Sequence, residues 1–262
     1  MVTTKAVKST ALEHLRGNWP KACSVAMIPV FATIAVVLIG YLLTLPFGTV
    51  IADVISVIIF ILLCAPLWMG ALRVYWRLAN GCDDDVAEAF YYFSGKIEYK
   101  RCFLFNLRVT AYWLKVELLV FFPCLLTYVF TNGDFYEWLG ISMPLILLNL
   151  RYLIYVFYLL AFIVTIIHIV KLYLPAFLLV SDEEMPPVLC FKRGIEVGAY
   201  TKSRFSGFAI GFLGWIILSL LFIPLLFTVP YLLMSYVVAC RYNVAYYNIS
   251  GKAQEDAPMH EI

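Results

Sequence analysis

The chain has 262 residues, of which 63% are hydrophobic, 17% are aromatic and only 14% are charged. Soluble domains are about 45–50% apolar and about 25% charged, so this composition excludes a water-soluble globular protein. A mean hydropathy of +0.89 excludes a disordered chain, and a net charge of only +2 excludes a nucleic-acid-binding protein. The composition therefore predicts one transmembrane domain over residues 1–262.

Charge-poor stretches predict the membrane spans, because a spanning helix needs about 20 apolar residues. The last stretch, residues 205–240, contains Pro224 and Pro230, so it predicts two antiparallel spans joined by a short turn rather than one long helix. The sequence therefore predicts an all-α bundle of six transmembrane helices. The four earlier spans are expected at about 22–45, 54–79, 102–129 and 145–179.

The distribution of basic residues predicts the orientation. Sixteen of the 19 Lys and Arg residues lie in the N-terminal tail, the connections after the second and fourth spans, and the C-terminal end. The opposite loops, at about 46–53, 128–144 and 223–229, contain none, although they hold acidic residues. The positive-inside rule then places both termini in the cytoplasm, in a multi-pass protein of the plasma (inner) membrane.

An internal repeat emerges when the sequence is shifted by 101 residues. Pro123 and Thr127 then align with Pro224 and Thr228 in one ungapped stretch. Both copies run in the same direction, which predicts a parallel repeat with a pseudo-two-fold axis along the membrane normal. The expected units cover about 54–129 and about 152–229, with flanking spans at 22–45 and 230–247.

Each unit contains a short amphipathic segment after an acidic turn. Apolar residues recur at roughly helical spacing over about 86–93 in the first unit and 188–197 in the second. Two interfacial helices on the cytoplasmic side are therefore expected, in contact with the lipid bilayer and with lysines level with anionic lipid headgroups. The alternatives are that these helices only seal that face or that they dock a lipid or a partner.

The third span carries ionised residues at bilayer depth. Arg108, Lys115 and Glu117 lie within it, and Arg151 begins the fourth span. Each such charge costs about 3 kcal/mol on insertion scales, so these residues are expected to face the bundle interior and to find partners. Glu117 is about 200° around the helix from Lys115, which makes Arg151 its predicted partner. The polar centre is either a binding site or polar path, or a structural ion pair.

Asp84, Asp85 and Glu88 form a second candidate site. Their spacing resembles the paired acids with which membrane prenyltransferases hold Mg²⁺ and a diphosphate, and carboxylates are suitable ligands for that ion. Those enzymes need a second such cluster, whereas residues 182–184 supply only a contiguous acidic triplet before two prolines. Capping of the following helix is the favoured interpretation of these acids. The three histidines lie far apart and no Cys-x-x-Cys pair occurs, so we expect no metal site and no cofactor.

The chain resembles an uncharacterised bacterial family of integral membrane proteins, known as domain of unknown function 975. Two stretches carry the resemblance, and the charged third span departs from it. The resemblance implies a multi-span protein of the bacterial inner membrane and implies no activity. The two stretches are Ala11-xxx-Leu15-Arg16-Gly17-Asn18-Trp19-x-Lys21-Ala22 and Gly211-Phe-Leu-Gly214-Trp215 through Pro230-Tyr231.

The sequence contains no signature of an activated nucleophile and no phosphate-binding glycine loop. We therefore expect a non-catalytic membrane protein, either an accessory subunit or a passage for a small solute or lipid. The alternative is a Mg²⁺-dependent membrane enzyme that acts on a lipid diphosphate through Asp84, Asp85 and Glu88. Protein partners are not predicted by the sequence.

Overall fold

The computed structural model describes residues 4–131, 153–218 and 222–255. Across these ranges the regular structure is helical, and no strand occurs in them. The elements are α1 (Thr4–Leu15), α2 (Trp19–Phe47), α3 (Thr49–Ile59), the π-helical turn η1 (Phe60–Cys64), α4 (Ala65–Ala79), the 3-10 turn η2 (Val86–Phe90), α5 (Tyr91–Ser94), α6 (Lys96–Thr131), α9 (Leu153–Lys171), α10 (Pro175–Ser181), α11 (Pro187–Gly211), α12 (Leu213–Leu218) and α13 (Phe222–Glu255).

Five helical segments in the described ranges are long and apolar enough to cross a membrane. The first three confirm the predicted spans at 22–45, 54–79 and 102–129, and the fourth covers residues 155–179 of the predicted span at 145–179. The all-helical class of a membrane protein is therefore confirmed. The segments are Trp19–Pro46, Ile51–Ala79, Lys96–Leu126, Tyr155–Ser181 and Pro224–Ser250.

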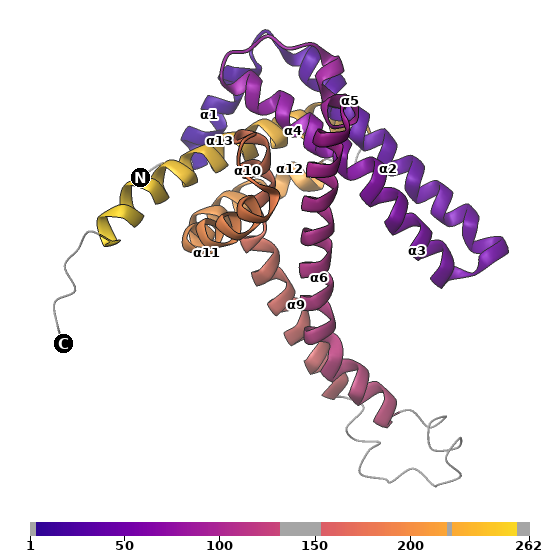
Figure 1. The fold of residues 1–262 in the computed structure, drawn as a ribbon. Helices are drawn as coiled ribbons and strands as arrows, with labels where there is room; N and C mark the ends of the chain where they lie inside the picture. The colour runs from indigo at the N-terminus through magenta and orange to yellow at the C-terminus, as the bar shows by residue number, and fades with distance from the viewer. Residues whose placement is uncertain (1–3, 132–152, 219–221, 256–262) are drawn as a thin grey trace, which may run out of the picture.

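The helices form two long hairpins that extend from a common body. Figure 1 shows α2 and α3 leaving the body in one direction, and α6 and α9 leaving it in another. The body consists of α1, α4, α10, α11 and the central part of α13, where most of the buried apolar residues lie. Many large apolar side chains of the hairpins are instead exposed, including Leu45 at 82% and Leu118 at 74%. Exposed apolar surface on this scale is what a lipid-facing helix presents.

Local sequence explains where the hairpin helices break. Gly48 separates α2 from α3 with φ of +76°, a left-handed conformation that costs a residue without Cβ little. Pro175 lies in the first turn of α10, where a backbone N–H is not needed for helical hydrogen bonds. Because proline has no N–H to donate to the carbonyl four residues earlier, α9 ends at Lys171. The fourth span, which the sequence assigned to one segment at 145–179, is therefore two helices joined at residues 172–174.

A buried polar network joins this break to α11 and α13. The hydroxyl groups of Tyr173 and Thr201 lie 2.6 Å apart, and the Asn243 amide donates to the Tyr173 hydroxyl at 2.9 Å. The ring of Phe205 stacks on Tyr173 with centroids 3.8 Å apart. The Tyr236 hydroxyl donates to the backbone carbonyl of Tyr173, which the helix break leaves without a helical partner. The network fixes the position of α10 against the body.

The structure differs from the sequence prediction around residues 188–240. The segment 188–197 is the first part of the continuous helix α11 rather than a separate interfacial helix. Residues 223–229, which the sequence assigns to a turn, lie in α13, and Pro224 falls near its start where proline is tolerated. Parts of other predictions, namely residues 132–152 with Arg151 and the tail from 256, lie outside the described residues.

Candidate functional site

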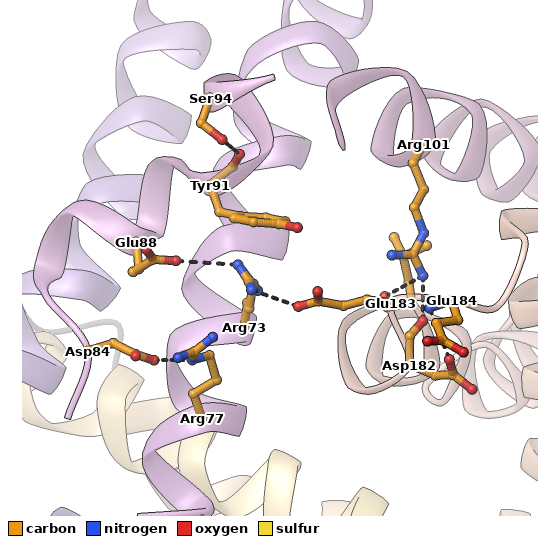
Figure 2. Close-up of polar contacts among 11 residues, drawn as sticks. Arg73, Arg77, Asp84, Glu88, Tyr91, Ser94, Arg101, Asp182, Glu183 and Glu184 are labelled. Carbon is orange, nitrogen blue, oxygen red and sulfur yellow. Dashed lines mark hydrogen bonds and ion pairs between the residues drawn. The ribbon is translucent and has the colours of Figure 1, made fainter. Parts of the chain in front are cut away.

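The two acidic turns of the chain meet at one buried arginine. Arg73 lies on α4 and is only 5% exposed. Its guanidinium contacts the Glu88 carboxylate at 3.3 Å and the Glu183 carboxylate at 2.6 Å (Figure 2). Glu88 lies in η2, shortly after α4 in the sequence, whereas Glu183 lies in the connection between α10 and α11. Arg73 therefore links two parts of the chain that are far apart in sequence.

An aromatic ring completes the surroundings of Arg73. The guanidinium carbon lies 3.3 Å from the centroid of the Tyr91 ring, a cation–π contact that a partly desolvated arginine strengthens. The neighbouring Tyr92 is buried, and burial raises the pKa of its hydroxyl. The guanidinium is therefore largely removed from water, whereas its two carboxylate partners remain partly exposed.

Two further ion pairs flank this contact. The Arg77 guanidinium lies 2.5 Å from the Asp84 carboxylate, and the Lys21 ammonium lies 2.8 Å from Asp83. The hydrogen bond from Lys21 lowers the pKa of the fully exposed Asp83. Arg73 pairs with Glu88 and Arg77 with Asp84, so the turn after α4 folds back with each basic residue opposite an acidic one.

Arg101 holds the second acidic turn through backbone atoms. Its guanidinium donates to the carbonyls of Leu179, Asp182 and Met185, with the first and last at 3.2 Å and 3.1 Å. The Asp182 carboxylate accepts from the backbone N–H groups of Glu184 and Met185, which closes the turn. Arg101 thereby caps the carboxyl end of α10, where carbonyl groups lack helical partners.

The structure gives each acid of the candidate metal cluster a different partner. Asp84 pairs with Arg77, and Glu88 pairs with Arg73. The Asp85 carboxylate accepts from the Val86 N–H at 2.6 Å, which confirms that this residue caps the following turn. Within the described ranges, no group of three or more His, Cys, Asp or Glu side chains is arranged to hold a metal ion.

The charged residues of the third span lie on α6, away from the Arg73 contacts. Arg108 and Lys115 are exposed, and Glu117 is half-buried. Because the two basic residues are seven apart, they share one face of α6, whereas Glu117 lies on the other side. Glu117 has no ion-pair partner among the described residues, and its predicted partner Arg151 lies outside them. The predicted burial of these charges in the bundle interior is not seen for Arg108 and Lys115.

Sequence reasoning missed Arg73, Arg77 and Arg101 as partners of the acidic turns. The signal for the local pairs was present, because Arg73 and Arg77 are four residues apart and so are Asp84 and Glu88. The turn at Asn80–Gly81 lies between the two arginines and the two acids. If the chain reverses there, each arginine can meet one acid. No comparable signal existed for the contacts of Glu183 and Arg101, which depend on how distant helices pack.

The described fold and its exposed apolar hairpins define the class of the protein, a helical membrane protein with at least five helices suited to spanning a bilayer. Comparison with protein-family models, with curated proteins and with solved structures finds no match.

Proposed function

We propose that the protein is a non-catalytic, multi-pass protein of the bacterial plasma (inner) membrane that provides a passage for a lipid. The broader prediction, an accessory subunit or a passage for a small solute or lipid, narrows to a lipid because of the exposed basic residues of α6. The proposal includes six spans with both termini in the cytoplasm.

The additional span, which is the fifth in chain order, would consist of the end of α11 together with α12. Residues 205–218 contain no charged side chain, and Ile210, Leu213 and Ile217 are between 52% and 68% exposed. Trp215 packs against Tyr231 of α13 with ring centroids 5.0 Å apart, so this segment runs beside the last apolar helix. Six spans return the chain to the side on which it began, in agreement with the positive-inside rule.

Glycine contacts support the internal repeat. A Cβ on Gly70 of α4 would lie 1.9 Å from the Ala89 carbonyl oxygen, and one on Gly194 of α11 would lie 2.5 Å from the Cα of Pro175. Each proposed unit therefore has a close glycine contact between the two elements that flank its acidic turn, with the glycine before the turn in the first unit and after it in the second. The two proposed interfacial segments would then be the start of α11 and the pair η2 and α5. Phe90 and Phe93, in η2 and α5, are exposed. Anionic lipid headgroups at the cytoplasmic face are their proposed partners.

The observation that carries the lipid proposal is the basic stripe of α6, defined as Arg101, Arg108 and Lys115. These residues are spaced by seven and so share one helix face. From Arg101, the helical rise places Arg108 about 10 Å and Lys115 about 21 Å further into the apolar region. Arg108 and Lys115 are exposed, between apolar neighbours such as Leu114 at 56% and Leu118 at 74%.

Exposed cations at this depth require an anionic partner, since each costs about 3 kcal/mol when unpaired. A second copy of the chain offers few candidates, because the described spans contain only Asp53, Glu98 and Glu117 as acids. Asp53 and Glu98 lie near span ends, and Glu117 is half-buried on the opposite side of α6. A lipid phosphate that moves along the stripe supplies the missing negative charge at Arg108 and Lys115, whereas Arg101 already donates to backbone carbonyls.

Lipid movement across vesicle bilayers tests this proposal. The purified protein is reconstituted with a headgroup-fluorescent phospholipid, and dithionite is added to bleach the outer leaflet. We expect wild type to raise the bleachable fraction above one half. The Arg108→Leu/Lys115→Leu variant should slow this about tenfold or more, because it loses a charge-assisted hydrogen bond to phosphate at each position.

The matched control is Lys5→Leu/Lys202→Leu, which removes two exposed basic residues from α1 and α11 instead. This control should scramble lipid at the wild-type rate. Wild type that moves lipid no faster than empty vesicles contradicts the passage and leaves the accessory subunit as the proposed function.

A Mg²⁺-dependent enzyme and membership in a known family are the two remaining proposals. The Mg²⁺-dependent enzyme has less support, because Asp84 and Glu88 form ion pairs with arginines and Asp85 is engaged as a cap. Membership in the family known as domain of unknown function 975 rests on the two sequence stretches alone. In the structure, the first of these forms the end of α1 and the start of α2, with Gly17 at φ +82° between them.

A further inference from the structure

An open pocket of about 510 Å³ lies between the start of α6 and the second acidic turn. This volume falls in the usual range for small-molecule sites. Lys96, Lys100 and Arg101 line it from α6, and Glu183 and Glu184 line it from the turn. The pocket therefore joins a basic helix face to an acidic turn.

Two of these charges are already committed to other partners. Arg101 donates to three backbone carbonyls, and Glu183 pairs with Arg73 at 2.6 Å. Lys96, Lys100 and the Glu184 carboxylate are exposed, and none of them has a hydrogen-bond or ion-pair partner among the described residues. The pocket thus offers two free ammonium groups and one free carboxylate.

The pocket opens toward the apolar part of α6. Ile97 is 79% exposed and Leu104 is 41% exposed, and both line the pocket on the same face as Lys100 and Arg101. Beyond Leu104 the face continues to Arg108. Apolar side chains next to a charged pocket at the end of a spanning helix are what a lipid with a polar headgroup would contact.

We propose that this pocket binds the headgroup of a phospholipid that carries a primary ammonium group. The phosphate lies between Lys96 and Lys100, and the ammonium donates to the Glu184 carboxylate. Ile97 and Leu104 contact the start of the acyl chains. This assignment rests on the proposed function, since it needs the start of α6 to lie at the membrane surface, and it names the lipid class that would enter the stripe.

The charges of the pocket give it a preference among headgroups. A purely anionic headgroup finds the two lysines but places its polar end next to the Glu184 carboxylate without a positive charge. A choline headgroup carries a positive charge but has no N–H to donate. Only a headgroup with both a phosphate and a primary ammonium satisfies all three free groups, and charge-assisted hydrogen bonds are the stronger kind.

Native mass spectrometry measures this preference directly. The protein, released from detergent, is mixed with equal amounts of phosphatidylethanolamine, phosphatidylglycerol and phosphatidylcholine of distinct masses. We expect wild type to bind phosphatidylethanolamine about three- to tenfold better than phosphatidylcholine, the range for one partly exposed charge pair. Glu184→Gln should bring this ratio close to one while lipid binding persists. Lys96→Gln/Lys100→Gln should weaken the binding of all three lipids.

The matched controls are Glu13→Gln on α1 and Lys5→Gln/Lys202→Gln on α1 and α11, which change the same charges at other exposed positions. Both should keep the wild-type ratio. Equal binding of the three lipids by wild type, or an unchanged ratio in Glu184→Gln, overturns the assignment. Lipid scrambling without an ammonium preference overturns the pocket alone, and an ammonium preference without scrambling overturns the passage alone.

Discussion

At the residue scale, Arg73 is buried, whereas the two carboxylates that pair with it are partly exposed. Its side chain is 6% exposed, whereas those of Glu88 and Glu183 are 41% and 52% exposed. Without the arginine, water can hydrate both carboxylates. Without the carboxylates, the guanidinium remains buried with the Tyr91 ring as its nearest partner, and burial of an uncompensated charge is costly.

This asymmetry predicts which substitution is more harmful. Glu88→Gln/Glu183→Gln should lower the free energy of unfolding by about 3–5 kcal/mol, because it strands a buried charge. Arg73→Met should lower it by about 2 kcal/mol, from lost pairing to half-exposed acids and a lost cation–π contact. Thermal unfolding in detergent measures both.

Lys21→Met is the control for that comparison, because its partner Asp83 is 96% exposed and stays hydrated without the pair, so this loss should have the smallest effect. If Arg73→Met proved more destabilising than the double glutamate variant, the guanidinium would not be the group that depends on its partners. The same melting curves would then favour a packing role for Arg73.

At the element scale, close approach between helices depends on glycines at particular positions. Gly198 of α11 contacts the end of α9, since a Cβ there would lie 2.4 Å from the Lys171 carbonyl oxygen. Gly70 and Gly194 likewise face backbone atoms that cannot rotate away as a side chain would. These helix pairs are therefore held at a distance that only glycine permits, as is common where membrane helices pack.

Alanine at these positions should separate the helices. Gly70→Ala and Gly194→Ala should each destabilise the protein by about 1–3 kcal/mol, the usual cost of an added methyl group in a tight contact. Gly207→Ala, on the same helix as Gly194, should instead stabilise it by about 0.5–1 kcal/mol, because nothing lies within 4 Å of its Cβ position. Melting temperatures in detergent distinguish the two outcomes. Equal effects at Gly194 and Gly207 would contradict the close packing of α11 on α10.

At the scale of the whole molecule, the hairpins and the body separate two environments. The tip between α2 and α3 is apolar and carries no basic residue, whereas the charged contacts of Arg73, Arg77 and Arg101 gather at the end of the spans near the body. The proposed orientation places the hairpin tip outside and the Arg73 contacts in the cytoplasm.

Cysteine accessibility in intact cells tests that orientation with a native control. Cys82, in the turn after α4, is exposed, and Thr49 at the α2–α3 tip is exposed as well. A membrane-impermeant maleimide should label Thr49→Cys in intact cells, and should label Cys82 only after the membrane is permeabilised. Labelling of Cys82 in intact cells would reverse the orientation.

The sequence by itself determined the membrane class, the helical secondary structure and the positions of the first three spans. Runs of apolar residues have one stable form in a bilayer, because every backbone N–H and C=O must be satisfied within the helix. Gly48 likewise marked a break through its own backbone chemistry, whereas the break before Pro175 was not predicted, because 145–179 was assigned to one span. The capping role of Asp85 was predictable for the same reason, since it involves only the neighbouring residue.

Only the tertiary structure decided which charges meet. The contact of Arg73 with Glu183 joins residues 110 positions apart, and Arg101 reaches carbonyls that α10 presents only because α9 breaks before it. Such contacts depend on how helices pack, and packing is set by side-chain shape and by glycines whose neighbours are distant in sequence. Helical periodicity predicted that Arg108 and Lys115 share a face, but whether that face is covered depends on the arrangement of all the helices.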